Sequence, residues 1–491
     1  MATTLSFYGG INEIGGNKIL LEDDKIKTFF DFGMSFSLAN KYFAEFLQPR
    51  KCNGVKDFIE FGLLPDIYGL YREDYEKHVG RKTSAEPFAD AVFLTHAHAD
   101  HSSYVHHLRQ DIPVFGSSAT KAILEALDVT GSSGFTEFIN LRRSFEIVPT
   151  KRGDGFKKLQ GEEAKVPRDI RVLDKKIEVN NISIEPILVN HSLPGATAYI
   201  IHTPKGTIVY TGDFRFHGYG GQLTRKFVKR VADIEPDVLI IEGTRVNETK
   251  KGTEKDVMEK VSKIISSTKE LVIVNFPVRD TDRMKSFYDA AKQNDRKLVV
   301  NLKQAYILTL LADTEIDAPT IDDKNIRIYL PRKTWGLITE KSDYPKNVVE
   351  QDYDGWEREF LEHKNAVTCE DVRENQGEYV FRCDFFELKG LIDIKPAEGS
   401  CYIRSVCEPF DEEMELDLKK VENWLQHFGL MPYHQIHVSG HVSGDELKDA
   451  ISEIKPKNVF PVHTEHPELF SKIVPSDTRV VLPEIGKEYS L

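Results

Sequence analysis

The sequence predicts an α/β protein built from more than one domain. Its 491 residues exceed what one hydrophobic core usually supports, which favours two or three domains. The first half alternates short β-rich runs with turn residues, whereas from Lys251 onward amphipathic helical patterns alternate with strands. These two textures predict a sheet-rich domain and a separate α/β unit with a parallel sheet.

The strands of the first half are predicted from runs rich in aliphatic and aromatic residues, with Gly or Asp at their ends. These runs are Thr4–Tyr8, Lys18–Leu21, Lys27–Phe32, Ala91–Thr95, Ile182–Val189, Thr197–His202, Thr207–Thr211 and Asp237–Ile241. Several of them end at a polar residue. Side chains at strand ends face one rim of a sheet, so residues distant in sequence can form one site there.

The second half gives a different set of elements. The expected helices are Glu254–Ser266, Arg279–Asn294, Leu416–His427 and Asp445–Ile454, and the expected strands are Leu271–Phe276, Lys297–Leu302 and Asn458–His463. The segments 36–62, 124–172 and 313–400 contain few recognisable motifs, and the last of them is charged and irregular. We predict domain sections at 1–250, 251–432 and 433–491, the last returning to the first domain.

Charge and composition narrow the classes of partner. The net charge of −13 argues against a generic basic coating for nucleic acid or an anionic membrane, so a nucleic-acid substrate would need local positive potential. The N-terminus lacks the pattern of a signal peptide, and no apolar run approaches the ~20 residues of a membrane helix. Five cysteines without a Cys-x-x-Cys pair favour reduced thiols. We therefore expect a cytoplasmic protein with no membrane partner.

The densest chemical motif is THAHADH, which directly follows the predicted strand AVFLT. Alternate residues of an extended chain point the same way, so His96 and His98 can share one metal ion, while Asp100 and His101 turn toward a second. Imidazole and carboxylate are ligands that zinc prefers. The alternative, a surface loop that is histidine-rich by chance, does not explain so dense a pattern.

HAHADH resembles the signature of the metallo-β-lactamase fold, and three further motifs fit that family in the same order. They are FDFG (Phe30–Gly33), NHSLPGA (Asn190–Ala196) and YTGDF (Tyr210–Phe214). The resemblance implies an αββα sandwich that holds two zinc ions, with Mn²⁺ or Mg²⁺ as substitutes in vitro. It implies that one ion is bound by His96, His98 and His191, and the other by Asp100, His101 and His463. Asp213 would lie between the two ions, and Asp31 would support a ligand without binding the metal itself.

The later part of the chain resembles the β-CASP nucleases, in which an α/β domain is inserted into this fold. IIEGTRV, with Glu242 and Thr244, is similar to their first motif, and HVSGHVS and PVHTE are similar to the next two. FYGGINEIGGN, LLPDI and PKNVFPVH are closest to the ribonuclease J family in its shorter, archaeal-type form. The resemblance implies cleavage of single-stranded RNA in the 5′→3′ direction, with an endonuclease mode; it leaves the oligomeric state open, a homodimer included.

The same resemblance assigns roles to residues around HVSGHVSGDEL. His441 would be the general acid, held by Glu242 with Thr244 nearby. Position alone favours a strand-end residue in a surface ion pair for Glu242, and the resemblance reverses that preference. His437, Ser439 and Ser443 would bind a 5′-terminal phosphate. Ser443 followed by Glu446 is also a capping box, and both readings can hold together.

Other readings of the sequence stay open. A hydrolase of small esters, lactones or β-lactams would use the same metal ligands, and a base-blind phosphate clamp does not distinguish RNA from DNA. His106 and His107 are expected to be solvated or to support the site from outside, and Arg283 and Lys303 to lie on a solvated face. Phe276 and Tyr306 are expected in the core.

Overall fold

A computed structural model describes residues 3–24, 26–44, 46–131, 135–249, 252–338, 344–409 and 412–491. The chain forms two compact units. Unit 1 comprises Met1–Phe216, Gly220–Lys250 and His441–Leu491, and unit 2 comprises His217–Tyr219 and Lys251–Gly440. The chain therefore contributes three residues to unit 2 at His217–Tyr219, returns to unit 1, builds the rest of unit 2 from Lys251, and returns again at His441. The identification of these units with the two expected domains stays a prediction.

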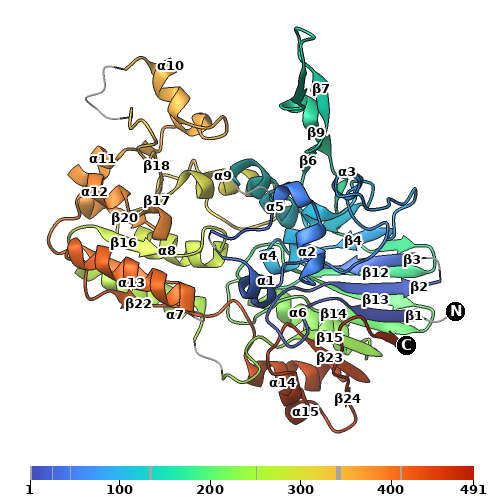
Figure 1. The fold of residues 1–491 in the computed structure, drawn as a ribbon. Coiled ribbons are helices and arrows are strands. Elements are labelled where there is room, and N and C mark those ends of the chain that lie inside the picture. The colour runs from blue at the N-terminus through green and yellow to red at the C-terminus, as the bar shows by residue number, and fades with distance from the viewer. Residues whose placement is uncertain are drawn as a thin grey trace. The chain divides into compact units, whose positions relative to one another are not determined.

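Unit 1 is built on two seven-stranded sheets (Figure 1). The first has the order β10-β5-β4-β3-β2-β1-β25 and contains β1 Thr3–Phe7, β2 Ile19–Asp23, β3 Ile26–Phe30, β4 Ala91–Phe93, β5 Val114–Gly116, β10 Ile170–Val172 and β25 Glu488–Ser490. The second has the order β11-β12-β13-β14-β15-β23-β24 and contains β11 Ile177–Val179, β12 Ile182–Leu188, β13 Thr197–Thr203, β14 Gly206–Tyr210, β15 Val238–Glu242, β23 Asn458–Val462 and β24 Arg479–Val480. All strands expected in the first half are present, with ends shifted by one or two residues.

The two sheets pack face to face through one aromatic-rich core. Phe7, Phe30 and Phe93 from the first sheet meet Tyr199 and Tyr210 from the second, and all five are buried. Alternation along each strand places these side chains on the inner face, and burial of such apolar surface is the main stabilising contribution to the sandwich. The inner faces therefore fix how the strand ends of the two sheets align.

Helices cover both outer faces. α2 Lys56–Glu60, α3 Glu73–His78 and α5 Ser118–Thr130 pack on the first sheet, and α6 Gly221–Ala232 and α14 Gly444–Ile454 pack on the second. In α6 the buried residues Phe227, Val228 and Val231 recur at helical spacing against Leu239 and Ile241 of β15. The result is the αββα sandwich that the sequence predicts. No helix in the described ranges is long and apolar enough to cross a membrane.

Two histidines of unit 1 lie where the sequence does not place them. His106 and His107, expected to be solvated or to support the site, are fully buried beside Phe58 and Tyr75. Tyr75 Oη lies 2.9 Å from His106 Nε2, whereas neither ring nitrogen of His107 has a hydrogen-bond partner in the described chain. Burial, with nearby arginines, lowers the pKa of His107 to about 3.

This burial makes unit 1 sensitive to acid. Below the ordinary pKa of 6.5 the unfolded chain binds a proton at His107 that the folded chain refuses, so stability falls as the pH drops from 6.5 toward 3. We compare the free energy of unfolding of His107→Leu with that of the parent. We expect this difference to shift in favour of the variant by about 2 kcal/mol between pH 7.5 and pH 5. Urea unfolding at both pH values measures this. As a control, Ile451→Val, in the separate core under α14, should cost the same free energy at both pH values. A pH-independent effect of His107→Leu would contradict the assignment.

Unit 2 contains a third seven-stranded sheet, with the order β19-β18-β17-β20-β16-β21-β22 and every strand pair parallel. Its strands are β16 Val272–Asn275, β17 Lys297–Val300, β18 Ile326–Tyr329, β19 Ala366–Val367, β20 Tyr379–Arg382, β21 Cys401–Arg404 and β22 His434–Gln435. Its main helices are α7 Glu254–Ser267, α8 Thr281–Gln293, α9 Leu302–Leu311 and α13 Glu412–His427. The parallel sheet expected from the β-α-β alternation is confirmed. The irregular segment 313–400 supplies β18, β19 and β20, the last lying between β17 and β16.

Arg283 corrects an expectation about unit 2. It is fully buried rather than on a solvated face, and its guanidinium donates to both carboxylate oxygens of Glu254 at 3.0 Å. It also donates to Ser405 and to the Val438 carbonyl, and one Nη lies 3.2 Å from His437 Nδ1. Arginine has no acceptor atom, so Nδ1 of His437 accepts and its Nε2 carries the ring proton. Phe276 is buried as expected.

Candidate metal centre

The predicted ligands of unit 1 all follow strand ends on its two sheets. His96 and His98 come just after β4, and the short helix α4 Ala99–Ser102 carries Asp100 and His101. On the second sheet, His191 follows β12, Asp213 follows β14 and His463 directly follows β23. Because the sandwich core aligns these ends, three separate segments of the second sheet face the one histidine-rich loop of the first.

The first group consists of His96, His98, His191 and Asp213, whose ligand atoms all lie within 4.8 Å of one another. His98 Nδ1 is 2.9 Å from His96 Nε2 and 3.1 Å from His191 Nε2. Both of those Nε2 atoms are 3.7 Å from Asp213 Oδ2. Three imidazole nitrogens and one carboxylate oxygen thus converge on a single point.

The second group consists of Asp100, His101, Asp213 and His463, again within 4.8 Å. His463 Nε2 is 3.1 Å from Asp100 Oδ2 and 3.6 Å from Asp213 Oδ2. His101 Nε2 is 3.2 Å from the same oxygen of Asp213. Asp213 is therefore common to both groups, which is the arrangement expected of a carboxylate between two metal ions.

These residues fit divalent cations that take nitrogen and oxygen ligands. Two imidazole nitrogens bound to one tetrahedral zinc ion are about 3.3 Å apart, close to the separations observed in the first group. His101 Nε2 and Asp213 Oδ1 are buried without a hydrogen-bond partner in the described part of the chain, which is costly unless something else contacts them. The donor set and the two unpartnered atoms both favour a cation in each group.

The charges of the site also favour cations. Asp31, Asp100, Asp213 and Glu242 are buried carboxylates within one cluster of histidines. Burial opposes ionisation of Asp100 and Asp213, yet the neighbouring histidines outweigh it and hold both pKa values below the usual range. Without metal, histidine protons must balance this negative charge, and metal binding at such a site releases protons.

Asp31 was expected to support a metal ligand, and it orients the ring of His101. Its Oδ2 lies 2.7 Å from His101 Nδ1 and accepts from Tyr210 Oη at 2.7 Å, while Thr95 donates to the carboxylate through both its backbone N–H and its hydroxyl. A carboxylate on one ring nitrogen fixes the tautomer and leaves the other nitrogen as a lone-pair donor. Thr95 and Tyr210 are therefore part of the site, although the sequence reading did not assign them; both stand within the quoted motifs.

The backbone around Asp100 is held by tight glycine contacts. Gly16 N and Asn17 N donate to the Asp100 carbonyl at 3.0 and 3.1 Å. A Cβ on Gly33 would lie 1.7 Å from that same carbonyl oxygen, so only glycine fits there. Asp31 and His463 have φ values of 57° and 52°, a strained conformation for residues with a side chain that is typical of functional sites.

His441 and Glu242 form the predicted pair. His441 Nδ1 lies 3.0 Å from Glu242 Oε2, and Glu242 Oε1 accepts from Phe214 N at 2.8 Å. Glu242 is fully buried, so this is no surface ion pair. Burial lowers the pKa of His441, but the carboxylates of Glu242 and Asp213 outweigh it and raise that pKa to about 9 in the metal-free protein. Thr244 Oγ1 lies 3.2 Å from His441 Nδ1 and 2.8 Å from His463 Nδ1.

The predicted phosphate contacts are divided between the units. Ser443 belongs to unit 1, where its N–H and hydroxyl both donate to the Glu446 carboxylate at the start of α14, as the capping-box pattern predicts. His437 and Ser439 belong to unit 2, where the Ser439 carbonyl lies 2.8 Å from His217 Nε2. The phosphate pocket itself stays a prediction.

Comparisons with known proteins agree with this geometry. The model of the beta-lactamase superfamily domain matches residues 65–270, and that of the Zn-dependent metallo-hydrolase RNA specificity domain matches residues 431–470. Ribonuclease J 2 of Streptococcus pyogenes is 24% identical over 80% of this chain and 62% of its own length. Ribonuclease J of Helicobacter pylori is 23% identical over 93% of this chain and 55% of its own length.

Two further matches differ in extent. Ribonuclease J of the archaeon Pyrococcus abyssi is 26% identical over half of this chain and 46% of its own length. A crystal structure of a protein of unknown function from Enterococcus faecalis matches with a TM-score of 0.73 and 22% identity, covering both chains fully, and this shows the fold alone. The chain spans little more than half of the length of the curated bacterial relatives. Both family models and the ribonuclease J relatives, together with the αββα sandwich, show that the chain belongs to the metallo-β-lactamase/β-CASP family.

Proposed function

We propose that the protein is a zinc-dependent ribonuclease of the ribonuclease J type, which hydrolyses single-stranded RNA from its 5′ end and also cuts internally. The proposal rests on one observation: the first and second ligand groups share Asp213, and the His441–Glu242 pair lies beside them. Two zinc ions would bind there, with the first group and the second group as their ligands. When bound, they would supply the positive charge that a polyanionic substrate and an attacking water require.

The protein's own residues would position this chemistry. Asp31 and Thr244 hold the rings of His101 and His463 from behind, so that their Nε2 atoms face the site. Asp100, whose Oδ2 lies 3.1 Å from His463 Nε2, would orient the attacking water for in-line displacement at phosphorus.

His441 would protonate the leaving 3′-oxygen. Glu242 Oε2 takes the hydrogen bond from Nδ1, which leaves Nε2 of the protonated ring to deliver its proton. The buried carboxylate favours the charged ring, so the acid is ready before substrate binds. His437, Ser439 and Ser443 would hold the 5′-terminal phosphate, and the Arg283 contact explains why His437 would offer its Nε2–H as a donor.

One comparison of substrates tests the proposal. The zinc-loaded protein is given one RNA with a 5′-monophosphate, 5′-triphosphate or 5′-hydroxyl end, together with DNA of the same sequence and a chromogenic β-lactam. We expect mononucleotides from the monophosphate form at least about ten-fold faster than from the others, since one charge-assisted hydrogen bond contributes about 1.5–3 kcal/mol. A chelator should abolish cleavage and zinc should restore it.

Each alternative has its own outcome. Equal cleavage rates for all three RNA ends would contradict the 5′-phosphate pocket but would still support nuclease activity. Faster cleavage of DNA would reassign the substrate, and hydrolysis of the β-lactam without any RNA cleavage would overturn the proposal. Sedimentation of the 56.0 kDa chain tests the expected homodimer.

A further inference from the structure

Residues 140–167 form an arm that projects from unit 1 (Figure 1). We call this segment the basic arm. It consists of two ribbons, β6 Asn140–Arg142 paired with β9 Lys165–Pro167 and β7 Ile147–Pro149 paired with β8 Phe156–Lys158. Ile147 and Phe156 are 64% and 73% exposed. A two-stranded ribbon that buries so little has marginal stability of its own, so exposed apolar residues on it suggest a binding role.

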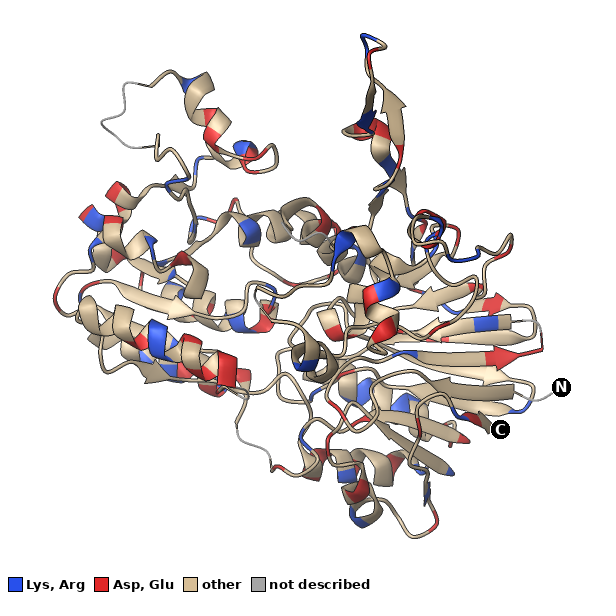
Figure 2. Ribbon diagram, viewed as in Figure 1, with Lys and Arg blue, Asp and Glu red and all other residues tan. Residues whose placement is uncertain are grey.

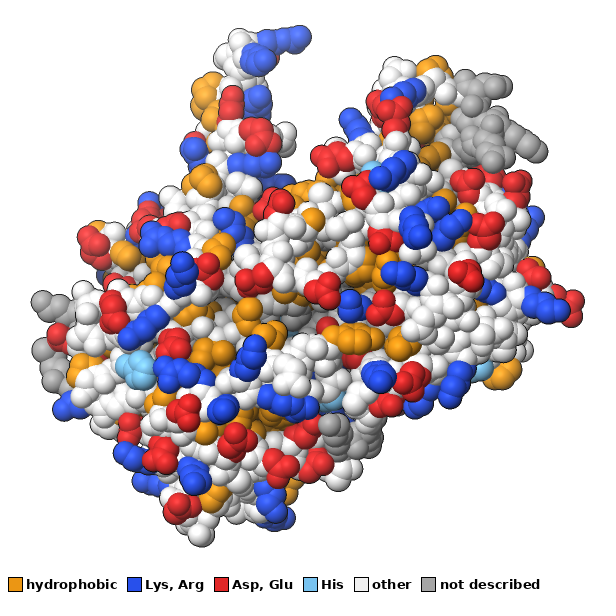
Figure 3. All heavy atoms as spheres, turned by 180° about the vertical axis from the view of Figure 1, so that it is seen from behind, with side chains coloured by type: hydrophobic (Ala, Val, Ile, Leu, Met, Phe, Trp, Pro, Cys, Tyr) orange, Lys and Arg blue, Asp and Glu red, His pale blue; other side chains and the backbone are white. Residues whose placement is uncertain are grey.

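The charge of the basic arm is opposite to that of the whole chain. It has seven basic and four acidic residues, a net charge of +3, whereas the chain carries −13. Within the described chain, Arg143 pairs with Glu146 and Lys165 with Glu162, while Arg142, Lys151, Arg152, Lys157 and Lys158 form no ion pair. Figure 2 marks Lys and Arg positions in blue along the ribbon of the arm, and the space-filling view of Figure 3 shows Lys or Arg side chains at its tip. Such unpaired cations on an acidic protein create a local positive field.

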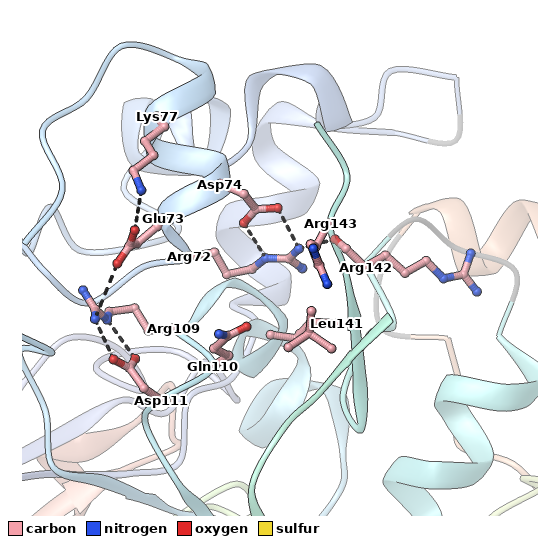
Figure 4. Close-up of a pocket in the computed structure, with 11 residues that line it drawn as sticks. Arg72, Glu73, Asp74, Lys77, Arg109, Gln110, Asp111, Leu141, Arg142 and Arg143 are labelled. Carbon is pink, nitrogen blue, oxygen red and sulfur yellow. Dashed lines mark hydrogen bonds and ion pairs between the residues drawn. The ribbon is translucent and has the colours of Figure 1, made fainter. Parts of the chain in front are cut away.

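Two hollows lie at the foot of the basic arm and share Arg142 and Arg143. In the hollow of about 530 Å³ the charges are largely neutralised, because Arg72 pairs with Asp74 and Arg109 with Asp111 (Figure 4). The hollow of about 410 Å³ differs. Of the basic residues in its lining, Lys51 pairs with Glu137, Arg143 with Glu146 and Lys165 with Glu162. Arg142 and Lys158, which also line it, form no ion pair within the described residues.

The second hollow is continuous with one face of the basic arm. Side chains alternate along a strand, so Phe156 and Lys158 share a face, and Ile147 lies opposite Lys158 in the ribbon. Lys158 also lines the hollow. An exposed aromatic ring next to a cation, leading into a basic hollow, has the combination of stacking surface and phosphate contact that single-stranded nucleic acid requires.

We propose that the basic arm and its 410 Å³ hollow bind single-stranded RNA at a site separate from the metal centre, with phosphates against Arg142 and Lys158 and a base stacked on Phe156. The inference rests on the proposed function for its choice of RNA. A duplex fits less well, because its bases are already stacked on each other and cannot cover the ring. The arm would hold a longer strand while its 5′ end is processed.

Fluorescence anisotropy tests this site with chelator present, so that the RNA stays intact. The probes are a labelled single-stranded RNA of about 30 nucleotides and one of about six, the second within the ~4–16 nucleotides that one groove covers. We expect Arg142→Ala/Lys158→Ala to weaken binding of the long RNA about ten-fold and to reduce its log–log salt slope by about 1.4, because both cations line the hollow. Phe156→Ala should weaken it similarly with the slope unchanged, because stacking releases no counterions.

A matched control removes the same charge elsewhere on unit 1. Lys175→Ala/Lys205→Ala changes two exposed lysines outside the arm and should leave binding of the long RNA unchanged. Both double variants should cleave the six-nucleotide RNA at the parent rate once zinc is restored. The arm site would be contradicted if both double variants lost affinity for the long RNA equally, or if binding of duplex RNA fell as much as binding of single-stranded RNA. Neither result would bear on the proposed nuclease activity. If the parent protein neither binds nor cleaves RNA, the proposed function fails with it.

Discussion

Asp213→Asn is expected to remove both bound zinc and RNA hydrolysis. Asp213 Oδ2 lies within 3.7 Å of a nitrogen of His96, His101, His191 and His463, so one oxygen serves both ligand groups. Asparagine keeps the shape but loses the charge that balances two cations. We expect a loss of kcat/KM of at least about 10³-fold, which corresponds to about 4 kcal/mol of transition-state stabilisation.

Metal analysis of the purified variant and steady-state cleavage of RNA measure this effect. Asp174→Asn, an exposed carboxylate outside the cluster, should keep the parent zinc content and rate. A variant at Asp213 that retains two zinc ions and full activity would falsify the shared-carboxylate assignment. Retained zinc with lost activity would instead limit Asp213 to a role in the reaction.

His441→Gln is expected to slow RNA cleavage by about 10²–10⁴-fold, the usual contribution of a general acid. The decisive measurement compares this RNA with a p-nitrophenyl phosphodiester. Nitrophenolate leaves without a proton, so the variant should cleave it at nearly the parent rate if His441 acts as the acid. Zinc content should not change, because the two ligand groups are complete without His441.

Glu242→Gln gives the companion result. It leaves the His441 ring in place but removes the carboxylate 3.0 Å from its Nδ1, so it should slow RNA cleavage in the same selective way and by a smaller factor. Equal losses on both substrates in either variant would show that the pair positions the substrate or a metal ion rather than protonating the leaving oxygen.

The metal centre could be read from the sequence because its chemistry is concentrated in short motifs. Four ligand-type residues stand within HAHADH, and His191, Asp213 and His463 each follow a strand that its composition predicts. Strand ends on a sandwich meet at one rim, which favours a single site, whereas the division into two ligand groups came from the resemblance to the metallo-β-lactamase fold. The roles themselves await the measurements above.

Other features depend on tertiary packing that no local pattern reveals. Arg283 stands in an amphipathic helix among polar residues, and its burial is made possible by the carboxylate of Glu254 from a neighbouring helix together with acceptors on Ser405 and Val438. His106 and His107 are buried by Tyr75 and Phe58, which come from other segments of the chain, and β20 has four residues within a charged stretch of sequence. The segment 124–172 contains the basic arm, whose two ribbons were not predicted from the sequence.

The position of β23 has a consequence for synthesis on the ribosome. The first ligand group is complete once the chain has passed Asp213, whereas the second waits for His463, after the chain has made unit 2 and β23 has paired in parallel with β15. A nascent chain can therefore hold at most one of the two ligand groups until residue 463 has been made. On the proposed function, the order of translation keeps the catalytic site incomplete while the chain is still beside the messenger RNA that encodes it.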